Sequence, residues 1–167
     1  GTEIVGDDGS VLTYTTPKAS GEGVDFRASA DRKWLRDNKL FTAVHLNTYG
    51  KYYWDNKNYN DVTAGLGVGV GYQNAITEVE LQPFYNNRWY GQGSSGEGSL
   101  DSYLDTTGVK LSLNQFLNPK VRYQGLVRYA ETDYIDKYDF NDGEDWLLAN
   151  TLVFLPNGQQ FWTVGAD

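Results

Sequence analysis

The chain has 167 residues, a length that suits one domain, and its formal net charge is −8. This charge and the lack of any Lys/Arg run of five or more argue against a nucleic-acid partner and a polybasic lipid anchor. No cysteine is present, which excludes disulfides and thiolate metal sites, and no apolar run reaches the ~18 residues of a transmembrane helix. With 13 Tyr, 5 Trp and 19 Gly residues, the composition favours β structure.

Residues 1–23, rich in Gly, Asp, Ser and Thr, are predicted to be a loop or extended segment ahead of one domain of strands over residues 24–167. From residue 24 onward, apolar residues recur at every second position, which is the period of a strand with one apolar side. The pattern predicts about eight antiparallel strands and no helix, at residues 24–34, 40–54, 61–72, 76–88, 102–116, 121–132, 146–155 and 160–166.

The third expected strand, DVTAGLGVGVGY at residues 61–72, is nearly bare on one side. Its apolar side is continuous, whereas the positions between hold one threonine and then four glycines: Thr63, Gly65, Gly67, Gly69 and Gly71. Glycine inside a strand is destabilising, so something must offset it. The bare side either leaves room for bulky charged side chains from neighbouring strands or lets the wall curve sharply.

The expected strands are long, and an 11-residue strand tilted by about 40° spans roughly 28 Å, close to the apolar band of a membrane strand. Short connections such as LRDNK and LNPK alternate with long ones such as WYGQGSSGEGSLD. This alternation is typical of an antiparallel up-and-down barrel in a bacterial outer membrane, with tight periplasmic turns and longer outer loops. We therefore predict an all-β transmembrane barrel whose apolar side meets lipid. A soluble barrel would turn that side inward.

Aromatic residues gather where the expected strands meet the longer connections, as in the girdle at a membrane interface. The predicted girdle comprises Tyr52, Trp54, Tyr59, Trp89, Tyr90, Tyr134 and Trp146. The alternative interpretation is that tyrosine simply favours strands.

Loop lengths also give the strands a direction. Residues 24–34 end at a short turn and residues 160–166 leave one, so both chain ends are expected at the outer surface. Because a complete bacterial barrel begins and ends in the periplasm, we interpret the chain as an interior piece of a larger barrel. The alternative is an eight-stranded barrel with reversed orientation or swapped closure. An open sheet of this size would expose two edges, which invite self-association.

Charged residues on the polar sides of the strands are predicted to form a ladder of opposite charges facing the lumen: Glu78, Glu80, Arg88, Lys110, Arg122 and Arg128. The alternative for Glu78 and Glu80 is glycoside chemistry by paired carboxylates. The lone histidine, His45, is interpreted as a polar wall residue and not a catalytic base, since no nucleophile motif accompanies it. We therefore predict no catalytic residue and no cofactor.

The connection over residues 133–145 holds six acidic residues: Asp133, Asp136, Asp139, Asp142, Glu144 and Asp145. Clustered carboxylates are the ligands that calcium prefers, but the spacing does not match the EF-hand loop. We interpret the segment as a solvated acidic loop, so that no metal site is predicted, and divalent-ion binding is the alternative.

Three segments resemble one family: GKYYWDNKNYNDVTAGLG at 50–67, VELQPFYNNRWYG at 79–91 and LNPKVRYQG at 117–125. They are similar to the C-terminal barrel of the surface lipoprotein assembly modulators, called Slam. The PFY and RWYG elements at 83–85 and 88–91 are the most distinctive part. The start GTEIVGDDG resembles the loop that follows the first barrel strand of that family. The similarity covers most of the chain.

The resemblance implies a place in a barrel of about fourteen strands, behind a periplasmic helical-repeat domain that these residues do not contain. It also implies a role in moving surface lipoproteins or related binding proteins to the bacterial surface, without bond chemistry. The expected partners are outer-membrane lipid and a client lipoprotein. A general porin or small structural barrel, and a soluble ligand-binding barrel of the lipocalin type, are the alternatives.

Overall fold

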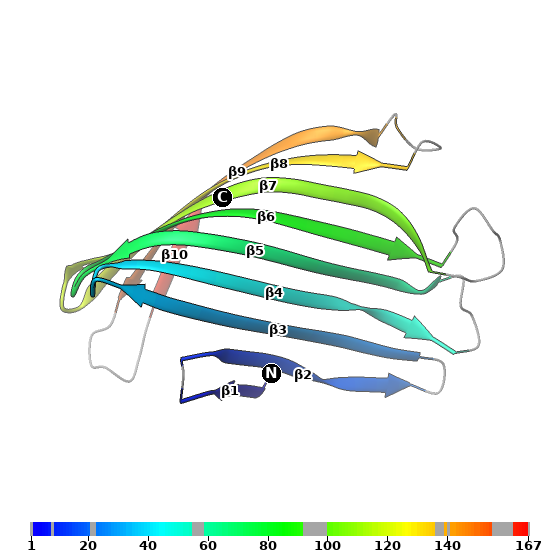
Figure 1. Ribbon diagram of the computed structural model, residues 1–167, viewed down its shortest axis with the longest axis horizontal. Coiled ribbons are helices and arrows are strands. Elements are labelled where there is room, and N and C mark those ends of the chain that lie inside the picture. The colour runs from blue at the N-terminus through cyan, green and yellow to red at the C-terminus, as the bar shows by residue number, and fades with distance from the viewer. Residues whose placement is uncertain are drawn as a thin grey trace.

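A computed structural model of the chain describes residues 2–7, 9–20, 23–54, 59–91, 100–135, 139, 141–154 and 162–166, with backbone alone at 15–20 and 162–166. Within these described residues, ten antiparallel strands form one sheet in simple chain order (Figure 1). They are β1 (Thr2–Val5), β2 (Val11–Ser20), β3 (Gly23–Arg36), β4 (Leu40–Tyr53), β5 (Asp61–Gln73), β6 (Thr77–Tyr90), β7 (Asp101–Asn118), β8 (Val121–Tyr134), β9 (Gly143–Phe154) and β10 (Trp162–Ala166). No pairing among the described residues joins β1 to β10, so the sheet is open there. None of them forms a helix long and apolar enough to cross a membrane.

Tight turns at one end of the sheet explain how long neighbouring strands stay in register. Between β3 and β4, Asp37 and Asn38 both have positive φ, 46° and 60°, as the central residues of a type I′ hairpin turn require. Between β5 and β6, the Asn74 Oδ1 accepts hydrogen bonds from the backbone N–H groups of Ile76 and Thr77 at 2.9 and 2.8 Å. The Asn74 side chain thus replaces the ladder bonds that end at this turn.

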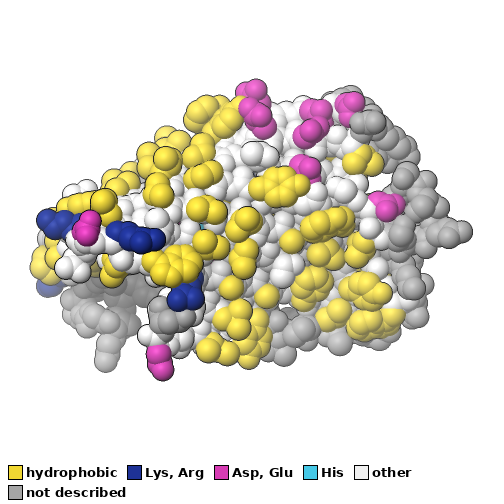
Figure 2. Space-filling view, viewed as in Figure 1, with side chains coloured by type: hydrophobic (Ala, Val, Ile, Leu, Met, Phe, Trp, Pro, Cys, Tyr) yellow, Lys and Arg dark blue, Asp and Glu magenta, His cyan; other side chains and the backbone are white. Residues whose placement is uncertain are grey.

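The two faces of the sheet differ sharply. One face, here called the apolar face, carries Leu46, Leu66, Val68, Val70, Leu81 and Leu111, and Figure 2 shows this face covered with hydrophobic side chains. Leu66, Val68 and Val70 are 44%, 48% and 53% exposed. A soluble barrel would bury this row, whereas here it is exposed, on the outer side of the curl as the sequence predicts.

The opposite face, here called the polar face, lies on the inside of the curl that carries β10 behind the other strands in Figure 1. All five hydrophobic residues that are buried among the described residues project from it: Phe41, Ala43, Phe84, Ala130 and Val153. Glu80, a charged residue on the same face, is only 8% exposed. The concave side therefore holds the small core and, beside it, the buried Glu80.

The glycine side of β5 belongs to this concave face, and neighbouring side chains fill the space above it. The Gln82 amide lies over Gly67, the Phe41 ring lies over Gly71, and the carboxyl of Glu80 lies over Gly69. A Cβ built on Gly69 would stand 2.7 Å from the Glu80 Cδ, inside any real contact distance. The glycines thus make room for side chains from β4 and β6, the first of the two gains expected from the sequence.

Strand positions follow the sequence prediction closely from residue 24 onward, but the first 23 residues differ. They contain β1 and β2, which pair with each other from Thr2 opposite Tyr14 to Val5 opposite Val11. The loop prediction rested on Gly, Asp and Ser, whereas Val11 to Thr15 alternates β-branched and aromatic residues that fit a pleated strand. Pro17 lies where the β2–β3 register shifts, a bulge that accommodates its missing N–H.

Candidate functional site

All six residues of the predicted charge ladder project from the polar face. The register sets Glu80 opposite Ser112, Lys110 opposite Gln82 and opposite Arg128, and these pairs share one side of the pleat. Arg88 follows the same alternation along β6, as Arg122 does along β8. No ion pair joins any two of the six within the described part of the chain. Where they are paired, the partners come from β3, β4, β5 and β9.

His45 on β4 is the centre of one ion network. Its Nδ1 lies 2.5 Å from Asp31 Oδ1 on β3, and its Nε2 lies 2.9 Å from Glu80 Oε1 on β6. A carboxylate can accept a hydrogen bond from each ring nitrogen, so the geometry fits a protonated imidazolium that bridges three strands. Because both nitrogens are engaged, neither is available to act as a catalytic base.

Lys33 on β3 makes a second ion pair, nearer the tight turns. Its Nζ donates to Glu78 Oε2 at 2.9 Å and to Gln73 Oε1 at 3.3 Å. The same ammonium lies 4.2 Å from the centroid of the buried Phe41 ring. Lys33 and His45 thus neutralise both predicted carboxylates of β6, which favours a structural ladder over a pair of catalytic acids.

Arg88 lies nearer the long connections and pairs with Asp61 on β5. Its Nε and Nη2 donate to the two oxygens of that carboxylate at 2.8 and 2.5 Å, a bidentate pair. The guanidinium also lies 5.9 Å from the Tyr103 ring centroid, and Tyr103 in turn contacts Tyr90 and Tyr134 at 5.9 and 5.3 Å. The register places Tyr90 and Tyr134, two residues of the predicted girdle, on the polar face.

The other girdle residues lie in several settings. Trp89 pairs with Val62 on the apolar face, and the exposed Tyr52 and Trp54 rings contact each other at 6.2 Å beside the β4 end. Tyr59 is exposed outside the strands, next to undescribed residues. Trp146 is 73% exposed and contacts the Tyr129 ring at 4.8 Å on the apolar face.

The acidic segment at residues 133–145 falls partly outside the described residues, which excludes Asp136 from any structural account. Asp133 is the last residue but one of β8, and Glu144 and Asp145 follow Gly143 at the start of β9. Asp142 accepts a hydrogen bond from the Tyr134 backbone N–H at 2.7 Å, and its own N–H donates to the Asp139 carbonyl at 3.0 Å. The described residues contain no group of three or more side chains arranged for a metal ion.

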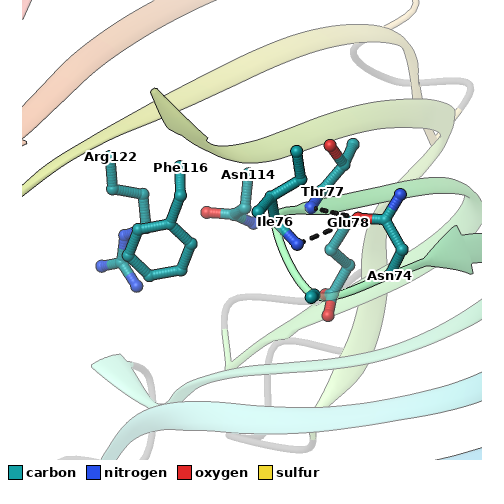
Figure 3. Close-up of a pocket in the computed structure, with 8 residues that line it drawn as sticks. Asn74, Ile76, Thr77, Glu78, Asn114, Phe116 and Arg122 are labelled. Carbon is teal, nitrogen blue, oxygen red and sulfur yellow. Dashed lines mark hydrogen bonds between the residues drawn. The ribbon is translucent and has the colours of Figure 1, made fainter. Parts of the chain in front are cut away.

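A pocket of about 300 Å³ opens at the end of the sheet where the tight turns lie (Figure 3). Its lining includes Asn74, Glu78, Asn114, Phe116 and Arg122. The register sets Phe116 opposite Arg122, so the guanidinium lies beside that ring. The Arg122 Nε is buried and has no hydrogen-bond partner in the described part of the structure.

The partners Asp31, Lys33, Asp61 and Asp145 were not predicted as site residues. Each lies in an expected strand or beside one, and Asp31 and Lys33 follow the polar side of residues 24–34. Alternation gives the face of a residue, but contacts across strands depend on register. A hairpin register counted from the three-residue loop at 37–39, with Arg36 opposite Leu40, sets Asp31 opposite His45.

Taken together, the site is the polar, ion-paired inner wall of an up-and-down antiparallel sheet whose outer side is apolar. A family model for the surface lipoprotein assembly modifiers matches residues 6–167. The chain belongs to this family. It is 39% identical over 150 residues to surface lipoprotein assembly modifier 2 of Haemophilus influenzae, covering 90% of this chain and 31% of that protein.

Two further relatives extend the comparison. The surface lipoprotein assembly modifier of Pasteurella multocida is 34% identical over 160 residues, covering 93% of this chain and 31% of the relative. The hemophilin secretion modulator of Acinetobacter baumannii is 22% identical over 153 residues, covering 90% of this chain and 29% of that relative. No solved structure matches the chain. The chain therefore spans about a third of the length of the curated relatives it matches.

Proposed function

We propose that the described sheet is part of the wall of an outer-membrane β-barrel, with its apolar face toward lipid and its polar face toward the lumen. The observation that carries the proposal is the exposure of the Leu66–Val68–Val70 row together with the burial of Glu80 on the other side. A membrane sheet has this polarity, because lipid solvates aliphatic side chains and the lumen holds the charges.

We further propose that the whole protein delivers surface lipoproteins to the cell surface, as the names of the relatives state for those proteins. This role involves passage and binding and no bond chemistry. The ion pairs made by Lys33, His45 and Arg88 support such a role. They keep the wall polar and neutralise the carboxylates that they contact. The partners on this view are outer-membrane lipid and the lipoprotein in transit.

Two neighbouring residues on β7 allow a matched test. Leu111 is exposed on the apolar face, whereas Ser112 faces the concave side opposite Glu80. A tryptophan at either position enlarges the side chain, but only Ser112→Trp narrows the lumen. In cells that produce the full-length protein and a tagged client lipoprotein, protease treatment of intact cells measures surface display. Membrane fractionation measures the amount of barrel.

We expect Ser112→Trp to reduce client display several-fold at an unchanged amount of outer-membrane barrel, while Leu111→Trp leaves display intact because lipid accommodates the ring. Full display of the client in cells that lack the protein would contradict the transport role. Recovery of the protein in the soluble fraction would contradict the membrane assignment.

A further inference from the structure

Charge on the polar face is not evenly neutralised along the sheet. Three pairs or networks join β3 through β6: Lys33 with Glu78, His45 with Asp31 and Glu80, and Arg88 with Asp61. On β7 and β8 the pattern changes. Neither Lys110 nor Arg122 makes an ion pair with any described residue, and Arg128 reaches only Asp145, whose side chain is half exposed.

Lys110 and Arg128 form the first cationic position. They are directly opposite each other across β7 and β8, an arrangement that is unfavourable for two like charges. The Lys110 Nζ lies 5.3 Å and the Arg128 Cζ 5.2 Å from the centroid of the buried Phe84 ring. The ring face partly offsets the repulsion. An anion beside the Lys110 ammonium and the Arg128 guanidinium would reduce the repulsion between them further.

Arg122 forms the second cationic position, in the pocket near the tight turns (Figure 3). Two other polar groups of that pocket already have partners: Glu78 pairs with Lys33, and Asn114 Oδ1 accepts from the Gln124 amide at 3.0 Å. The buried Arg122 Nε is the unused donor. A buried donor without a partner is unfavourable, so a carboxylate that reaches it would be bound favourably.

The distance between the two positions indicates the shape of the ligand. Arg122 and Arg128 are six residues apart on one strand, roughly 20 Å at about 3.3 Å per residue. An extended peptide that runs along β8 repeats this spacing between residues i and i+6 on one side. Gln124 and Leu126 lie on the same face between the two arginines and carry no charge. A nucleic acid, with a phosphate at every residue, would find no matching cations there.

We propose that the polar face of β7 and β8 binds an extended acidic segment of polypeptide, with acidic side chains near Arg122 and near the Lys110–Arg128 pair. The inference rests on the proposed function, because a client in transit is the polypeptide that would meet this wall. It specifies which part of the wall holds the client and which chemistry the client presents.

A binding assay tests this separately from transport. The full-length protein in lipid nanodiscs is titrated against a fluorescein-labelled peptide of Ser and Thr that carries two glutamates six positions apart. A second peptide has glutamines in place of the glutamates. Fluorescence anisotropy should show tighter binding of the glutamate peptide, with the difference shrinking as salt is raised.

Substitutions on the wall locate the contact. Lys110→Gln and Arg122→Gln should each weaken binding of the glutamate peptide by about fivefold, as loss of one exposed ion pair at the upper end of its range implies. Arg122→Lys keeps the charge but lacks the Nε donor, so it should recover only part of the affinity, which separates the charge from the Nε hydrogen bond. Arg27→Gln removes the same charge from the exposed polar side of β3 and should leave binding unchanged.

Equal binding of the two peptides would overturn the inference, as would an Arg27→Gln variant that weakens binding as much as Arg122→Gln does. If such a result accompanies normal client display in cells, the binding site fails while the proposed function stands. If display is also independent of the protein, the proposed function fails as well.

Discussion

Replacing Gly69 with alanine tests how the glycine side of β5 is used. A Cβ at this position would lie 2.7 Å from the Glu80 Cδ and 3.0 Å from both carboxylate oxygens. Ordinary contact begins near 3.4 Å, so the carboxyl must move by about 0.7 Å. Glu80 is 8% exposed and its Oε1 lies 2.9 Å from the His45 Nε2, so this movement disturbs both packing and an ion pair.

Two opposing effects set the magnitude. Overpacking of a filled site costs about 1–3 kcal/mol. Alanine is favoured over glycine in a strand by roughly 0.5–1 kcal/mol, because glycine loses more backbone freedom on folding. We therefore expect Gly69→Ala to lower the free energy of unfolding by about 1–2 kcal/mol. In a Glu80→Ala background the obstruction is gone, and the same substitution should instead stabilise by about 0.5 kcal/mol.

The four proteins of this double-mutant cycle can be compared by reversible urea unfolding of the full-length protein in lipid vesicles, followed by tryptophan fluorescence. The decisive quantity is the change of sign between the two backgrounds. An equal loss of stability on Gly69→Ala with and without the Glu80 side chain would show that the carboxyl does not occupy the space above the glycine.

Three further predictions concern the faces, a turn and an ion pair. Leu111→Arg should destabilise the membrane-inserted protein by about 2–4 kcal/mol, whereas Ser112→Arg next to it should cost little; vesicle unfolding compares the two. Asn74→Ala removes the acceptor of the Ile76 and Thr77 N–H groups and should cost about 1 kcal/mol in the same assay, and an unchanged midpoint would refute the role of this side chain. Arg88→Lys loses the bidentate geometry with Asp61; its cost should stay below about 1 kcal/mol because the side chain is 40% exposed, and a larger loss would indicate a drier site than the structure has.

The strands were predictable because each has an apolar side and a polar side. The two sides face different surroundings, so apolar and polar residues alternate along the sequence. Residues 61–72 illustrate this, since the alternation from Val62 to Tyr72 fixed β5 to within one residue of Asp61–Gln73. The same reasoning missed β2, where Gly and Ser at its flanks outweighed the alternation of Leu12 and Tyr14 with threonines. A four-residue strand such as β1 is too short for periodicity to reveal.

The site was predictable only as a list of residues on one face. Glu80 was expected opposite a cation of the same ladder, yet its partner is His45, two strands away across the glycines of β5. That contact depends on β5 having no side chains at Gly67 and Gly69, a condition that pairwise alternation does not express. The polar-face position of Tyr90 and Tyr134 could not be predicted, because closeness to a long connection does not determine which face of the sheet a ring projects from.

The empty side of β5 also limits how such a wall can change over time. Side chains of β4 and β6 occupy the volume above the glycines. A larger residue in place of a glycine therefore requires a shorter side chain at the position that lies over it. Positions 69 and 80, 67 and 82, and 71 and 41 should accordingly covary, with small residues on one side accompanying long ones on the other. Across related sequences, the summed size of each such pair should vary less than the size of either residue alone.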